Sequence, residues 1–116
     1  MAENKNEVMS MDELDHVAGG SYAEIEMDMR FLNALGFISK SQIPTDGVNE
    51  SNFDRVNKLV HEAWAKSGII MRGTEGGLNS YTLPAGAEPY GNDRMAALRY
   101  AAYINKRSDV DPERFR

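Results

Sequence analysis

Residues 21–36 read SYAEIEMDMRFLNALG, and this stretch has the clearest helical pattern in the chain. Its apolar residues recur at spacings of four, three and three, which places them on one face of an α-helix. They are Ile25, Met29, Leu32 and Leu35. Ser21 and Glu24 form the S-x-x-E pattern of a capping box, and Gly36 is suited to end the helix. The sequence therefore predicts a helix over residues 22–35.

A second, shorter helix is predicted immediately upstream, where residues 9–20 read MSMDELDHVAGG. Ser10 and Glu13 form another capping box, in which the serine oxygen accepts the backbone N–H of Glu13 and the Glu13 carboxylate accepts that of Ser10. Met9 and Leu14 occupy the two positions of a hydrophobic staple. Both features fix the start of this helix at Ser10.

Gly19 and Gly20 are predicted to end the short helix, because a glycine readily adopts the positive φ found after helix C-termini. An isolated helix of fewer than about 12 to 15 residues is marginal in water. It must therefore pack either against the rest of this protein or against a partner protein that folds it on binding. The spacing alone does not choose between these two.

Residues 9–20 resemble the leader peptides of double-glycine secreted peptides, which include class II bacteriocins, colicin-V-type microcins and peptide pheromones. Leaders of this family have an apolar residue, Ser, two variable residues, Glu-Leu, two variable residues, an apolar residue, one variable residue and Gly-Gly. Every fixed slot is filled here, by Met9, Ser10, Glu13, Leu14, Val17, Gly19 and Gly20. The resemblance covers the first 20 of 116 residues and implies nothing about the chemistry of the others.

The resemblance implies processing and export. Such leaders bind the N-terminal cysteine-peptidase domain of an ABC transporter, which cuts after the second glycine and passes the remainder across the membrane. It implies a processing site at Gly19, Gly20 and Ser21, with Ser21 as the new N-terminus. It also implies a leader-recognition set that docks on the peptidase domain, made of Met9, Ser10, Glu13, Leu14 and Val17. The precursor would be cytoplasmic and the cleaved product extracellular.

Length and charge divide the chain into two parts. At 116 residues it holds at most one globular domain, so we expect a leader at 1–20 and a small secreted cargo domain at 21–116. The net charge of −5 is concentrated in the leader, whose five acids and one base give −4, whereas 13 acids and 12 bases in the remainder give −1. A nearly neutral cargo argues against nucleic acid or an acidic membrane surface as its partner, because both favour a basic face.

Several classes of protein are excluded by what the sequence lacks. There is no cysteine, and hence no disulfide framework, thiolate metal site or cysteine nucleophile. No apolar run approaches the roughly 18 residues of a stable membrane span. The N-terminus also lacks the basic start and apolar stretch of a general secretory signal, so the double-glycine leader would supply a different route of export.

The rest of the chain predicts a small α+β domain, mostly helical with one β-hairpin. Helices are predicted over 52–67 and 92–106 from apolar periodicity and capping residues. Between them, two short β-prone runs joined by a glycine-rich connection predict a hairpin across 69–83. Residues 37–50 are expected to form a loop, and the charged tail at 108–116 is expected to fray. One core should bury Ile25, Leu32, Phe53, Val60, Trp64, Met95 and Leu98.

No catalytic or metal-binding motif is complete in this sequence. His61-Glu62 begins the H-E-x-x-H zinc pattern, but residue 65 is alanine, so His61 is expected on a helix surface. The tail acids Asp109, Asp111 and Glu113 lack the glycine and the bidentate Glu of a calcium loop. We therefore expect no catalytic residues, no metal and no cofactor.

The sequence favours the precursor of a bacteriocin-like protein or a small secreted effector that is not an enzyme. Its cargo is long, is not cationic and has no membrane-length apolar segment. A folded domain that binds a target or immunity protein is therefore as well supported as membrane disruption. The alternative is an intracellular protein-interaction or regulatory module, in which Gly19 and Gly20 only end a helix. A third interpretation is a precursor for enzymatic modification at Ser and Thr.

Overall fold

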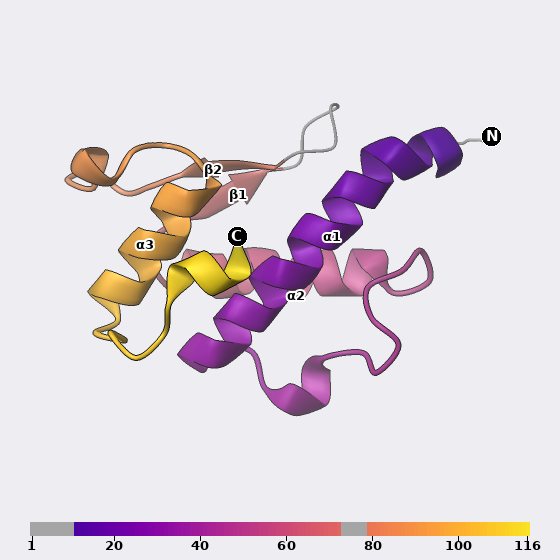
Figure 1. Cartoon of the computed structure of the whole chain (residues 1–116), viewed down its shortest axis with the longest axis horizontal. Helices are drawn as coiled ribbons and strands as arrows, with labels where there is room; N and C mark the ends of the chain where they lie inside the picture. Colours follow the sequence, from indigo (N-terminus) through magenta and orange to yellow (C-terminus); the bar gives the residue numbers. More distant parts are fainter. Residues whose placement is uncertain (1–10, 73–78) are drawn as a thin grey trace.

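The computed structural model describes residues 11–72 and 79–116, with the backbone alone over residues 11–21. Three α-helices and one two-stranded antiparallel sheet make up this part of the chain (Figure 1). Their order is α1 (Met11–Leu35), α2 (Phe53–Ala65), β1 (Ile70–Arg72), β2 (Ser80–Thr82) and α3 (Arg94–Ile104). Three short 3-10 helices accompany them, η1 (Lys40–Gln42), η2 (Glu88–Tyr90) and η3 (Pro112–Phe115). The predicted α+β class is confirmed.

α1 is a single helix of 25 residues and includes Gly19, Gly20 and Ser21. The predicted helix end at Gly19 and the predicted new start at Ser21 are therefore wrong. Glycine lowers helix stability by about 1 kcal/mol relative to alanine, but it does not forbid a helix. Continuing a helix adds one hydrogen bond per residue, whereas ending it and starting again repeats the unfavourable nucleation step. The continuous helix avoids that second nucleation.

The predicted apolar face of α1 is confirmed, and it packs across α2 (Figure 1). The buried residues on this face include Ile25, Met29, Leu32 and Leu35. The Phe31 ring stacks on the Trp64 ring of α2, with 5.8 Å between their centroids. Trp64 itself has no solvent exposure. The helix predicted over residues 52–67 and its role in the core are thus confirmed.

The predicted hairpin is also confirmed, with β1 antiparallel to β2. Met71 and Tyr81 are paired across the two strands and both are buried, whereas the flanking strand residues are exposed. This alternation is that of a sheet with one face on the core. The predicted glycine-rich tip falls on residues 73–78, outside the described part of the chain.

The C-terminal tail packs against α1 and α3 through η3, so the prediction that it frays is wrong. Val110 is buried, and the Phe115 ring contacts the Phe31 ring edge-on, with 5.4 Å between centroids. The prediction relied on the charged composition of the tail and did not take these two apolar residues into account. The burial of Val110 and the partial burial of Phe115 supply free energy that orders the segment.

One apolar core unites the three helices, the hairpin and the tail. Five of the seven predicted core residues are buried, and Phe53 and Met95 are partly buried against the same core. Within the described residues, no helix combines the length and apolar character needed to cross a membrane.

Candidate functional site

The residues implicated by the leader pattern lie at the N-terminal end of α1. Gly19, Gly20 and Ser21 are consecutive residues within this helix. Three of the predicted recognition residues, Glu13, Leu14 and Val17, are in its first turns, where the structure describes the backbone alone. Met9 and Ser10 lie outside the described residues. Figure 1 shows the first turns of α1 extending past the hairpin and the other helices.

Tyr22, the second residue after Gly20, is the first residue of α1 whose side chain the structure describes, and it contacts the folded part of the protein. The Tyr22 ring lies 5.0 Å from the Phe53 ring at the start of α2, measured between centroids. Glu24 Oε1 accepts a hydrogen bond from the backbone N–H of Asn79 over 2.8 Å. Ile25 has no solvent exposure. The predicted processing site therefore borders directly on residues that are anchored in the fold.

A buried polar network, missed by the sequence analysis, lies one turn further along α1. Asp28 has no solvent exposure. Its Oδ2 atom accepts hydrogen bonds from Trp64 Nε1 over 3.3 Å and from the Tyr81 hydroxyl over 2.5 Å. Its Oδ1 atom accepts a hydrogen bond from Arg94 Nε over 2.7 Å. One carboxylate thus joins α1, α2, β2 and α3.

Arg94 extends the network to the C-terminus. Its Nη2 atom donates a hydrogen bond to the backbone carbonyl of Phe115 over 2.6 Å. Its Nε atom also lies 3.9 Å from Glu24 Oε2, so two carboxylates of α1 face the same guanidinium. Arg94 therefore links η3 to both α1 and α3.

Desolvation governs the charge state of this network. Burial raises the pKa of Asp28 from 3.8 to about 6, and the nearby Arg94 charge and the Tyr81 hydrogen bond only partly offset that rise. Burial and the adjacent Asp28 charge raise the pKa of Tyr81 far above its ordinary value. Tyr81 consequently remains a hydrogen-bond donor, whereas Asp28 changes charge close to neutral pH. Because Asp28 has no solvent exposure, its hydrogen bonds join α1 to α2, β2 and α3 inside the core.

The sequence did contain a signal for this network. Asp28 lies three residues after Ile25 and four before Leu32, which places a charged side chain on the apolar face of the helix. A buried carboxylate needs hydrogen-bond donors and a counter-charge. That placement alone predicts a buried partner, although it does not identify Arg94.

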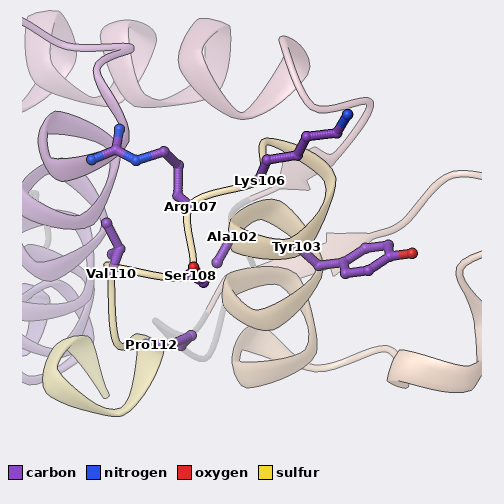
Figure 2. Close-up of a pocket in the computed structure, with 7 residues that line it drawn as sticks. All are labelled: Ala102, Tyr103, Lys106, Arg107, Ser108, Val110 and Pro112. Atoms are coloured by element: carbon purple, nitrogen blue, oxygen red, sulfur yellow. The ribbon is translucent and has the colours of Figure 1, made fainter.

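A separate groove of about 470 Å³ lies between the end of α3 and the segment that follows it (Figure 2). Its lining residues are Ala102, Tyr103, Lys106, Arg107, Ser108, Val110 and Pro112. Arg107 donates to the Leu35 carbonyl and pairs with Asp109, so its charge is already engaged. In Figure 2 the side chains of Tyr103, Lys106 and Arg107 diverge. This groove offers an apolar contact surface without converging reactive groups.

The folded structure does not bring further metal-binding side chains to the incomplete zinc pattern at His61-Glu62, among the residues that it describes. No group of three or more His, Cys, Asp or Glu side chains that could hold a metal occurs among the described residues. His61 lies on α2 and is half-buried, and its Nε2 atom is enclosed without a hydrogen-bond partner in the described structure.

Comparisons with protein-family models, with curated proteins and with solved structures found no match for this chain.

Proposed function

We propose that this protein is the precursor of a bacteriocin-like or small effector protein. In this proposal a peptidase-containing ABC exporter recognises residues 9–20, cuts after Gly20 and releases residues 21–116 outside the cell. The observation that carries the proposal is the match at every fixed slot of the double-glycine leader pattern. The released cargo would act by binding another protein, a target or an immunity partner, without enzymatic activity.

The position of the pattern relative to the fold supports this proposal. Among the side chains that the structure describes, the buried apolar cluster begins at Ile25 and continues to Val110. The Tyr22–Phe53 contact is the first ring contact after Gly20 in this part of the chain. A cut at Gly20 would leave all of these contacts in the released product.

The leader residues themselves suit docking on a peptidase domain. Leu14 and Val17 are three residues apart on a helix, and that spacing places both on one face. Apolar residues spaced in this way anchor helices in grooves of partner proteins. Two residues without a Cβ atom would then let the backbone lie close to a narrow catalytic cleft.

A second candidate is an intracellular interaction or regulatory module. The observation that favours it is the continuity of α1 through Gly19 and Gly20, which makes residues 11–21 part of the same helix as the core residues. In this alternative the N-terminal turns of α1 would present a surface to a partner and would never be removed. The two candidates differ in whether the chain is cut.

Co-expression with an exporter distinguishes them. The full chain is expressed in a bacterial host with a peptidase-containing ABC exporter of double-glycine leaders. The proposal predicts residues 21–116 in the medium, and predicts their loss when the catalytic cysteine of the exporter is replaced by alanine. The variant Gly20→Val should keep the protein inside the cell, because a branched Cβ atom does not fit a cleft shaped for glycine. Full-length protein retained in the cytoplasm with the active exporter would favour the interaction module.

A further inference from the structure

We infer that the folded core controls how fast the leader is removed: contacts of Tyr22 and Glu24 hold the residues after Gly20 in α1 and thereby restrict access to the Gly20–Ser21 bond. This inference depends on the proposed function and concerns the regulation of the same site. Its partner is the peptidase domain, which would act on a transiently opened form of α1.

The scissile bond lies within regular helix. Each carbonyl of an α-helix bonds the N–H four residues later, so the carbonyl at this bond is occupied while residues 20–24 remain helical. A narrow cleft that takes the bare backbone of two glycines must first separate that backbone from its helical partners. Opening of the helix on the core side of Gly20 is therefore part of the reaction path.

Three contacts on the core side resist this opening. The centroids of the Tyr22 and Phe53 rings lie 5.0 Å apart, and Glu24 Oε1 accepts a hydrogen bond from the Asn79 N–H over 2.8 Å. Glu24 also faces Arg94 at 3.9 Å. Unwinding residues 21–24 would break all three contacts, and the next residue, Ile25, is fully buried. Local unwinding of α1 should therefore extend no further than Glu24.

Cleavage in such a case follows the population of the opened form, provided that opening and closing are faster than cutting. A change that weakens the Tyr22–Phe53 contact should raise that population and the cleavage rate in equal proportion. A change of similar size at the C-terminal end of α1 should leave the opened population and the cleavage rate unchanged, because local opening near the Gly20–Ser21 bond does not involve that end of the helix.

The chain offers a matched pair of phenylalanines for this test. Phe53 and Phe37 are both partly buried against the core, but only Phe53 contacts Tyr22. Phe37 follows the C-terminal end of α1, and the last residue of that helix lies about 21 Å along the helix axis from Ser21. The experiment incubates full-length wild-type protein, Phe53→Ala and Phe37→Ala with a purified exporter peptidase domain. Rates of product formation come from intact mass, and hydrogen exchange reports opening at residues 21–24.

We expect Phe53→Ala to be cut roughly three- to tenfold faster than wild type, with faster exchange at residues 21–24, and Phe37→Ala to be cut at the wild-type rate. Phe53→Leu, which keeps apolar volume but removes the ring contact, should give a smaller increase if Phe53→Ala does not fold. Equal rates for wild type and both Phe53 variants, or equal acceleration by Phe37→Ala, would overturn the inference while leaving the leader assignment intact. No cleavage of any of the proteins would overturn the proposed function itself.

Discussion

Arg94 Nε donates a hydrogen bond to Asp28 Oδ1 over 2.7 Å, which places a charge-assisted bond inside the apolar core. Asp28 is fully buried, whereas the Arg94 side chain keeps 14% of its surface exposed. The carboxylate thus depends on one guanidinium for its counter-charge, although Tyr81 and Trp64 also donate to it.

Removing this guanidinium should destabilise the protein strongly. Replacing Arg94 with Met keeps much of the aliphatic stem but leaves a buried carboxylate without its counter-charge, at a cost of roughly 3 kcal/mol or more in the free energy of unfolding. Urea unfolding, followed by the fluorescence of the buried Trp64, measures this cost. The control Arg99→Met removes an arginine whose ion pair with Glu113 is exposed, and it should cost less than about 1 kcal/mol. Similar losses for the two variants would contradict a dominant role for the buried pair.

The pH dependence of stability should reveal Asp28. Its pKa is about 6 in the folded protein and 3.8 ordinarily, so between these values the folded state binds more protons than the unfolded state. The Asp28 contribution to the free energy of unfolding should therefore increase as pH falls from about 7 to about 4, by roughly 3 kcal/mol at most.

The variant Asp28→Asn isolates this contribution. The pKa values of Glu26, Asp109 and Glu113 are lowered by hydrogen bonds from arginines, and these groups act in the opposite direction in both proteins. Subtracting the urea-unfolding profile of Asp28→Asn from that of wild type removes them. A difference that is flat between pH 4 and pH 7 would show that the pKa of Asp28 is not raised.

Lys106 should be replaceable by glycine with a gain in stability. This lysine follows α3 with a φ of +58°, a conformation that non-glycine residues rarely adopt. Arg107 N donates to the Ala102 carbonyl over 2.9 Å, which is the bond of a helix end that favours glycine at residue 106. We expect Lys106→Gly to raise the free energy of unfolding by about 0.5–1 kcal/mol. Lys106→Ala keeps the strained conformation and should give no such gain, and an equal gain in both variants would exclude a backbone cause.

Removal of residues 1–20 should leave the cargo folded. Among the described side chains the buried apolar cluster runs from Ile25 to Val110, and residues 1–20 carry mainly acidic charge. Thermal melts of the full chain and of residues 21–116 should agree within a few degrees, which corresponds to about 1 kcal/mol in a domain of this size. A truncated protein that is molten or insoluble would instead favour the intracellular module.

Local patterns in the sequence predicted the helices and the hairpin because those patterns report which face of each element is buried. They failed where two local rules compete. The glycines at 19 and 20 can end a helix or continue one, and the continuous helix was not foreseen. In the tail, the charged residues outnumber Val110 and Phe115, and the Phe115 ring packs on Phe31, which is distant in the sequence.

The buried network around Asp28 likewise could be predicted only in part from the sequence. Asp28 was recognisable as a charged residue on an apolar face, but its partner Arg94 lies 66 residues away. No spacing rule joins such residues, since they come together only because α3 packs on β2 and η3, and η3 packs on α1. The leader-like pattern is different, because its predicted recognition residues are close together in the sequence and can be proposed without the fold.

The most direct test of the leader assignment is the intact mass of the product formed by an exporter peptidase domain. We predict one cut in the wild-type chain, between Gly20 and Ser21, and no cut in Gly20→Val. Leu14→Ala should weaken leader binding about tenfold or more, since a buried leucine side chain contributes roughly 1.5–3 kcal/mol. Glu13→Ala should weaken it mildly through the lost capping box, at about 1 kcal/mol or less. The matched control Asp15→Ala, in a variable slot of the pattern, should behave as wild type. An uncut wild-type chain, or cleavage that is indifferent to both Leu14→Ala and Gly20→Val, would contradict the assignment of residues 1–20 as a leader.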